Sequence, residues 1–279
     1  MPPTLYFDTN VFRYFASAFN DAPIEPDLRD HFAISPLSLL ELLSQLATPG
    51  AGEAFRAAQT LLNVFGPDYT AILPWQDEVL RVLVFGAPAE PGNIAELLNN
   101  ATQNVLNARS PADVEGEARE LRDFLAQAKY EAAENFAQVL ASWRQDGPIE
   151  EVDHRRIFAV STAHRAGVPP EGIDPDGVIM KLNAYWIYET RRIENAAGEP
   201  DYNPHNHQHE NDAFDSEQLV YLAHPDLHFL TTDGGFRKAP SSAQYNRIHR
   251  APPRVFENAT LATNLIRSIV QPASMANPA

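Results

Sequence analysis

Short apolar runs mark the first part of the chain. Residues 4–8 and the stretch HFAIS at 31–35 are apolar and short, so we expect both to form buried strands. The second run ends at Ser35-Pro36, a pair that favours the start of a helix. The leucine-rich segment LSLLELLSQL follows, and Glu41 lies on this predicted helix within a narrow polar stripe.

Strand and helix patterns return in the last third of the chain. Residues 212–223 have the pattern of a helix, 227–231 that of a buried strand and 247–250 that of a weaker strand. A closing helix is predicted over 259–270. Alternating strands and helices form a parallel sheet that helices cover. The sequence therefore predicts an α/β fold with its site at the carboxyl ends of the strands, where open α/β sheets bind ligands.

The middle of the chain, residues 53–195, has almost wholly helical periodicity. A helix start is predicted at 110–113, and apolar residues follow at steps of three or four between Leu121 and Trp143. A similar pattern over 179–193 predicts another helix. We therefore expect a helical block between the two α/β segments.

The length of 279 residues suits one large domain or a domain with a sizeable insertion. The patterns favour the second arrangement, with a core made of residues 1–48 plus 205–279 and a helical insertion at 49–204 packed on it.

The absence of cysteine excludes disulfides and thiolate zinc sites. The start MPPTLYFDTNVF has no basic leader and no stretch approaches membrane-spanning length, so we expect a soluble, cytoplasmic protein with no membrane partner.

The formal net charge of −16 argues against an ordinary basic nucleic-acid binder. The charge is unevenly spread, because from Gly234 onward six basic residues face Glu257 alone, a net +5, and the remainder carries −21. This basic segment begins one residue after Asp233. It is a candidate phosphate-binding rim.

Four acids occupy corresponding places in the predicted elements. Asp8 ends the first strand, Glu41 lies on the helix after the second, Asp215 opens a later helix and Asp233 ends the strand after it. Brought to one edge of a sheet, these carboxylates would repel one another. Divalent cations would resolve the conflict, and oxygen ligands suit Mg²⁺ or Mn²⁺. Each aspartate taken alone has a simpler interpretation, as a residue that begins a turn or caps a helix.

Three stretches together resemble the PIN-domain nucleases: LYFDTNVF, SPLSLLELL and DSEQLVYLAHPDLHFLTTDGGF. In that family the third acid opens a helix and the fourth follows a threonine at the end of the next strand. Asp215, Asp233 and Thr231 match that arrangement. The resemblance covers about residues 4–48 and 210–250. It implies a PIN-like, Rossmannoid sheet and a metal-dependent endoribonuclease that cuts single-stranded regions of RNA.

The resemblance also implies roles for individual residues. Those expected to be catalytic and to bind metal are Asp8, Glu41, Asp215 and Asp233. Asp212, one turn before Asp215, is either a further outer metal ligand or part of the helix cap with Asn211. Those expected to support the carboxylates through hydrogen bonds are Asn10, Ser35, Asn211, Thr231 and Thr232. Independently of the resemblance, the basic segment after Asp233 and an amphipathic helix supply the residues expected to contact substrate phosphate, which are Arg237, Lys238, Lys181 and Arg191.

Two other functions remain open at this stage. A haloacid-dehalogenase-like phosphatase also has a nucleophilic aspartate after its first strand, but it needs an acid two residues later, where this chain has Asn10. A catalytically silent PIN scaffold for protein binding is the second, since fold does not guarantee activity. An antitoxin or other regulatory protein is one candidate partner, and oligomerisation is left open. The alternating His205, His207 and His209 are read as part of a solvated loop, because they are poorly placed for one tetrahedral zinc.

Overall fold

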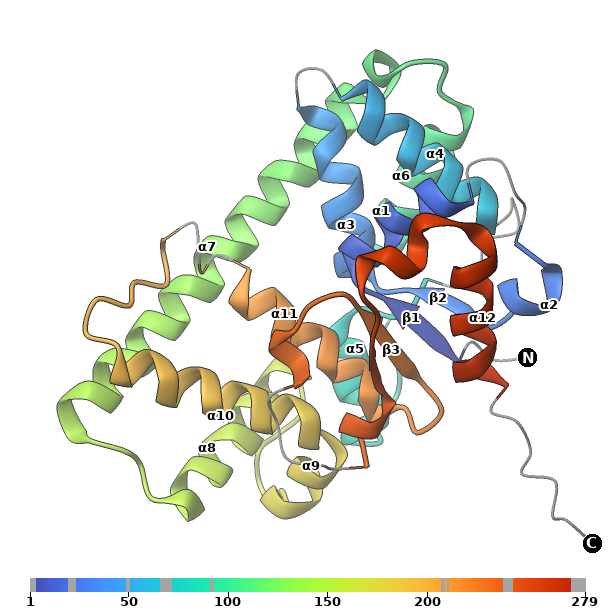
Figure 1. Cartoon of the computed structure of the whole chain (residues 1–279). Coiled ribbons are helices and arrows are strands. Elements are labelled where there is room, and N and C mark those ends of the chain that lie inside the picture. Colours follow the sequence, from blue (N-terminus) through green and yellow to red (C-terminus); the bar gives the residue numbers. More distant parts are fainter. Residues whose placement is uncertain are drawn as a thin grey trace, which may run out of the picture.

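A computed structural model gives the arrangement of the chain (Figure 1). It describes residues 4–19, 24–48, 51–65, 72–90, 93–206, 209, 211–237 and 243–271. The described residues form one four-stranded sheet, all parallel, in the order β2-β1-β3-β4. The strands are β1 (Leu5–Phe7), β2 (Phe32–Ile34), β3 (His228–Thr231) and β4 (Ile248–Arg250).

The register brings the two ends of the chain side by side. Leu5 of β1 pairs with Phe32 of β2 on one side and with His228 of β3 on the other. The prediction of an α/β fold with a parallel sheet flanked by helices is therefore confirmed. Parallel strands all end at the same edge of a sheet. Asp8, which follows β1, and the residues after Thr231, which follow β3, therefore lie at this one edge.

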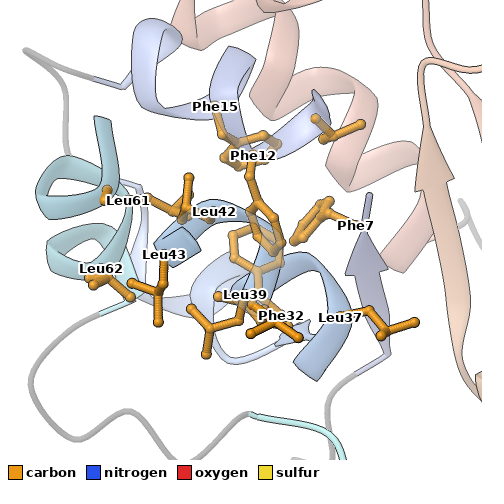
Figure 2. Packing of buried hydrophobic residues seen from close by; sticks show 14 of the residues in the cluster. Phe7, Phe12, Phe15, Phe32, Leu37, Leu39, Leu42, Leu43, Leu61 and Leu62 are labelled. Atoms are coloured by element: carbon orange, nitrogen blue, oxygen red, sulfur yellow. The ribbon is translucent and has the colours of Figure 1, made fainter. Parts of the chain in front are cut away.

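One face of the sheet carries Leu5, Phe7 and their neighbours, because side chains alternate along a strand. In Figure 2 the ring of Phe7 lies with those of Phe12 and Phe32, close to leucines from two helices. The ring centroids of Phe7 and Phe12 are 5.4 Å apart. The helices that pack on this face include α1 (Thr9–Ala18), α2 (Pro26–Arg29), α3 (Pro36–Ser44), α4 (Gly52–Phe65), α6 (Asn93–Asn107) and α12 (Ala259–Val270).

Tyr6 points to the opposite face, where its ring stacks on Phe229 at 4.8 Å. Its buried hydroxyl donates to the carbonyl of Gln218 at 2.7 Å, which satisfies the one polar atom of the ring. The elements with buried residues in this second core include α5 (Gln76–Val79), the π-helical turn Leu80–Val84, α8 (Glu151–Arg165), α9 (Pro175–Lys181), α10 (Asn183–Gly198) and the 3₁₀ turn Leu219–Ala223.

The predicted insertion shares both cores with the sheet. Its longest helix, α7 (Glu115–Asp146), runs diagonally across Figure 1. Leu121 and Leu125 near its start belong to the first core. Farther along, Trp143 packs with Ile193 of α10 in a small third cluster. The helices of residues 49–204 therefore complete the burial of the sheet on both sides.

The helix predicted over 179–193 is interrupted at Leu182, where α9 ends and α10 begins. Gln244, from the far end of the chain, explains the break. Its side-chain amide donates to the carbonyl of Lys181 at 2.6 Å and accepts from the N–H of Ala184 at 2.7 Å. These two bonds replace helical ones, so a distant residue overrides a local periodicity.

Other boundaries also move from their predicted places. The helix predicted over 212–223 is α11 (Asp212–Gln218) followed by the 3₁₀ turn. The predicted start at 110–113 is a 3₁₀ turn with a capping box, and α7 begins at Glu115. The further 3₁₀ turns are Gln45–Ala47, Gly235–Arg237, Tyr245–Arg247 and Pro253–Glu257. Among the described residues, no helix is both long and apolar enough to span a membrane.

Arg165 of α8 ties the insertion to α11, the helix that carries Asp215. Its guanidinium lies 2.7 Å from Glu217 on α11 and 2.9 Å from Asp77 on α5. The Glu217 side chain is 21% exposed, so it depends on this partner more than a fully solvated acid would. We expect Arg165→Met to lower the free energy of unfolding by about 2 kcal/mol, measured by urea denaturation.

Arg155 provides the matched control for this prediction. It makes two ion pairs of similar length, but its partners Glu151 and Asp176 are 75% and 77% exposed. Exposed pairs are worth about 0–1 kcal/mol. Arg155→Met is therefore expected to be nearly neutral, and equal effects of the two substitutions would contradict an anchoring role for Arg165.

Candidate functional site

The four acids singled out in the sequence line one cleft of about 420 Å³. Asp8 follows β1 directly, and Asp233 comes two residues after the end of β3. Glu41 reaches the cleft from α3 and Asp215 from the first turn of α11. The cleft lies at the edge where the parallel strands end, because both strand-end aspartates line it. Residues more than 220 positions apart are thus gathered at one place.

Asp8 is held by three donors. Its Oδ1 accepts from the N–H of Val11 at 2.7 Å, so the side chain caps α1. Its Oδ2 accepts from the hydroxyl of Thr231 and from the N–H of Thr232 at 3.3 Å. Burial nevertheless raises the pKa of Asp8, because the lost hydration outweighs these hydrogen bonds. The carboxylate is therefore fixed in position and costly to keep charged.

Glu41 is held by one hydroxyl and one cation. The buried Thr9 donates its hydroxyl to Oε2 of Glu41. The ammonium of Lys129 lies 3.8 Å from Oε1, and the two side chains are 19% and 22% exposed. Lys129 comes from α7, within the predicted insertion, so this helix contributes a positive charge to the acid cleft.

Asp215 is the most perturbed acid of the cleft. Burial, followed by the charges of Asp233 and Glu41, raises the pKa of Asp215 to about 8. Smaller contributions come from Asp212 and Asp8. Burial is the largest cause of this rise in pKa, and the charge contributions add to it because the neighbouring carboxyl groups are close to Asp215. The negative charges at this edge of the sheet are therefore crowded in the protein without bound ions.

Asp233 is exposed at the rim of the cleft. Its own N–H donates to the hydroxyl oxygen of Thr231 at 2.9 Å, and its Oδ1 accepts from the N–H of Gly235 at 2.8 Å. Thr231 thus contacts both strand-end aspartates, donating to Asp8 and accepting from Asp233. This local network fixes the turn after β3 and leaves the carboxylate accessible.

Asp212 faces away from the four acids. Its Oδ2 accepts from the hydroxyl of Tyr202 at 2.9 Å and lies 3.2 Å from Nδ1 of His209. It lines a second hollow rather than the acid cleft. Asn211 occupies the cap position of α11 without a capping side-chain bond, and its Oδ1 accepts from Lys129 at 2.6 Å.

The other predicted supporting residues divide between the cleft and the core. Asn10 is exposed and lines the cleft. Ser35 is buried and caps α3, accepting from the N–H of Ser38 at 3.1 Å. Ser38 in turn donates to the carbonyl of Phe7 at 3.0 Å. Ser35 therefore fixes the helix that carries Glu41 and, in these contacts, does not touch a carboxylate.

Of the four residues predicted to contact phosphate, the two whose side chains the structure describes lie away from the cleft. The ammonium of Lys181 donates to the carbonyl of Val84 at 2.6 Å, and Arg191 lines the second hollow. The side chain of Arg237 and all of Lys238 lie outside the described residues. Instead, the described cations that line the cleft are Lys129 and Arg13, neither of which belongs to a predicted site motif.

Part of the predicted histidine loop makes specific contacts. Nε2 of His205 lies 2.8 Å from Glu134 of α7. The ring of His209 lies 4.1 Å from that of Tyr202, centroid to centroid. His207 lies outside the described residues. His205 therefore contacts α7, and His209 contacts both Tyr202 and Asp212.

The donor chemistry of the cleft suits hard cations, because all four acids offer oxygen ligands. Among the described residues, however, no three histidine or acidic side chains are close enough together to hold an ion as they stand. Asp8 and Glu41 are instead engaged by hydroxyl groups, by backbone N–H groups and by Lys129. In this arrangement the four acids line one cleft without forming a ready set of metal ligands.

Comparison with known proteins adds no family to this description. No family model, no curated protein and no solved structure matches the chain. The resemblance to PIN-domain nucleases stays a prediction that rests on the three motifs. What the structure adds is the geometry, in which the acids of those motifs line one cleft.

Proposed function

We propose that this chain is a PIN-like, metal-dependent endoribonuclease that hydrolyses RNA phosphodiester bonds at the acid cleft. The observation that carries this proposal is the gathering of Asp8, Glu41, Asp215 and Asp233 in one cleft. Acids on four separate elements have no folding reason to converge, because their mutual repulsion raises the free energy of the folded state. A crowded carboxylate cleft at the carboxyl edge of a parallel sheet favours a site for cations and phosphate.

Asp8, Asp215 and Asp233 are the residues that would hold Mg²⁺ or Mn²⁺, with Glu41 as a further ligand. A bound ion would activate a water molecule and neutralise charge on the phosphate. Thr231 and the N–H of Thr232 orient Asp8, and Thr9 orients Glu41. Their role in this proposal is to keep the carboxylate oxygens directed into the cleft.

Lys129 and Arg13 have a separate role in the proposed reaction. Both line the cleft, and Lys129 is only 19% exposed. A cation with little access to water interacts with phosphate more strongly than a solvated one. We assign Lys129 to the non-bridging oxygens of the phosphate undergoing hydrolysis, with Arg13 at the more exposed side of the cleft.

The phosphatase alternative is disfavoured by the contacts of Asp8. Both carboxylate oxygens of Asp8 already accept hydrogen bonds, which lowers their nucleophilicity. Asn10, two residues later, has no proton to give to a leaving group. A silent scaffold would not need four mutually repelling acids at one edge. Hydrolysis by a water molecule is therefore the function that the cleft supports best.

Incubation of the purified protein with total RNA is the test of this proposal. We expect endonucleolytic cleavage in Mn²⁺ or Mg²⁺, none in EDTA, and none by Asp233→Asn in either condition. A covalent phosphoaspartate trapped at Asp8 would support the phosphatase instead. No cleavage of RNA by the wild-type protein in either metal would contradict the nuclease proposal.

A further inference from the structure

A second hollow of about 410 Å³ lies next to the acid cleft. Small-ligand pockets typically have volumes of about 300–1,000 Å³. The lining includes Tyr188, Arg191 and Arg192 of α10 together with Tyr202, His209 and Tyr245. The hollow is thus rich in rings and guanidinium groups, and half of these residues come from one inserted helix.

One layer of side chains separates the two hollows. Asp212 and Asp215 are one turn apart on α11 and line the second hollow and the acid cleft respectively. Gly235 lines the second hollow, and its N–H donates at 2.8 Å to Asp233 of the acid cleft. A molecule that occupies both hollows must therefore be extended. It must place one group in the acid cleft and a chemically different neighbouring group among the rings and guanidinium groups of the second hollow.

A pair of stacked rings forms another part of the same wall. Tyr188 lines the second hollow and Phe236 lines the acid cleft. Their rings stack with centroids 5.4 Å apart and an angle of 27° between the planes. The wall between the two hollows is therefore apolar and packed at this point.

The charges around the second hollow balance. Arg191 and Arg192 are accompanied on the lining by Glu199 and Asp212. Arg192 is also paired with Glu189 at 2.7 Å. A phosphate would lose its hydration on entry and gain little electrostatic attraction from such a balanced lining. A neutral aromatic group avoids the free-energy cost of dehydrating a charge. The electrostatics therefore favour an uncharged ring as the occupant.

The lining of the hollow includes an aromatic pair and an arginine with a buried donor atom. The rings of Tyr202 and His209 lie against each other, with their centroids 4.1 Å apart. The Nε of Arg192 is buried and has no hydrogen-bond partner in the described part of the chain. A buried donor without a partner raises the free energy of the protein. The guanidinium of Arg192 also lies 3.9 Å from the centroid of the Phe136 ring, so this side chain has a fixed place on the lining.

We propose that the second hollow binds one unpaired base of an RNA strand, next to the phosphodiester bond in the acid cleft. This inference rests on the proposed endoribonuclease function. Unstacked RNA bases are recognised by aromatic rings and arginine planes, the groups that this hollow presents. Arg191, predicted to contact phosphate, is assigned here to the base side of the strand. The hollow would thereby select single-stranded RNA, because a paired base cannot enter it.

Removal of single bases from a defined substrate tests this assignment. A short single-stranded RNA with one cleavage site is prepared as a series, each member with an abasic nucleotide at a different position. We expect one position next to the cleaved bond to raise KM about 5- to 150-fold, the range for loss of one base–aromatic stack, with kcat nearly unchanged. Tyr202→Leu should show the same rise in KM on intact RNA and no further rise with that abasic substrate.

Two matched variants separate stacking from a structural effect. Tyr202→Phe keeps the ring and loses only the hydroxyl that donates to Asp212, so its KM should stay near the wild-type value. Tyr130→Leu removes a tyrosine that is 57% exposed on α7 and should leave KM unchanged. All variants are compared by thermal melting. A flat abasic series, with Tyr202→Leu equal to wild type in KM, would overturn the inference while leaving the nuclease proposal intact.

Binding of nucleoside monophosphates in EDTA keeps the inference testable without cleavage. Calorimetry with AMP, GMP, CMP and UMP should show saturable binding of at least one to the wild-type protein and to Tyr202→Phe, but not to Tyr202→Leu. Such binding in a protein that does not cleave RNA would retain the base site and reject the proposed function. No binding of any of the four, together with no RNA cleavage, would reject both.

Discussion

Asp215→Asn is expected to lower the rate of RNA cleavage at least a thousandfold and to raise the melting temperature of the metal-free protein. The first effect, about 4 kcal/mol in activation free energy, follows from loss of a charged ligand next to the reacting phosphate. The second follows from burial and from the crowding of Asp215 by Asp233 and Glu41. Among the described residues no donor bonds to this carboxylate, so the substitution removes repulsion without breaking a hydrogen bond.

The stability effect has a defined dependence on pH. The pKa of Asp215 rises from 3.8 to about 8 on folding, so the folded protein binds a proton that the unfolded chain has released. The metal-free wild type should therefore lose stability as pH rises from about 4 to about 8. Asp215→Asn should flatten this slope and be more stable by on the order of 1 kcal/mol at neutral pH, since the cleft is partly solvated.

Urea unfolding in EDTA at a series of pH values measures this difference. Asp153→Asn serves as the control, because Asp153 is an exposed acid in the first turn of α8. That variant should follow the wild-type pH dependence and retain full RNA cleavage. If Asp215→Asn is instead less stable than wild type at neutral pH without metal and still cleaves RNA, Asp215 is only a helix-start residue.

Lys129→Met is expected to lower kcat/KM for RNA about 10- to 100-fold while tightening the binding of Mn²⁺. Methionine keeps most of the apolar length of the side chain but removes the charge that lies 3.8 Å from Glu41. The phosphate loses a cation in a partly desolvated cleft, which accounts for the fall in rate. The acids lose a competing positive charge, which accounts for the gain in metal affinity.

Single-turnover cleavage and Mn²⁺ titration of the same preparation test both halves of this prediction. Lys129→Arg should recover part of the activity, because it restores the charge with a different shape. Arg119→Met removes an exposed cation that lies nearly three turns earlier on α7 and should change neither quantity. A Lys129→Met variant that binds Mn²⁺ more weakly than wild type would show that Lys129 has a structural role only.

The strand-end acids were predictable because their positions depend on local patterns. A short apolar run that stops at Asp8 or before Asp233 predicts both a strand and its carboxyl end. Parallel pairing then brings such ends to one edge without further information. The same logic extends to Asp215, which opens the helix before the last of these strands.

Lys129 was not predictable from those patterns, because its place depends on how α7 packs against α3. The sequence does contain a signal, since Lys129 follows Leu121 and Leu125 at steps of four and so lies on the apolar stripe of the helix. A charged residue on such a stripe needs a buried partner. That partner, Glu41, is 88 positions away, and only the tertiary structure identifies it.

The direction of Asp212 and the break at Leu182 have the same origin. Helical spacing correctly places Asp212 near Asp215, but Tyr202 and His209 bond its carboxylate on the other side of the wall. The periodicity of 179–193 is real, yet Gln244 satisfies the interrupted backbone and makes the break stable. In both cases a hydrogen bond from a segment outside the local pattern decides the outcome.

Thermal melting of wild type, Asp8→Asn and Asp153→Asn with and without Mn²⁺ tests the central claim that the acids of the cleft together hold a metal ion. Asparagine can still cap α1 through its one carbonyl oxygen, but its NH2 group cannot accept from Thr231 and Thr232. The test therefore compares the gain that each protein obtains from Mn²⁺ with its own metal-free state. At a hundredfold excess of Mn²⁺ over Kd, wild type and Asp153→Asn should gain about 2.7 kcal/mol, and Asp8→Asn much less. Equal stabilisation of all three proteins by Mn²⁺, or none, would contradict a shared metal site in this cleft.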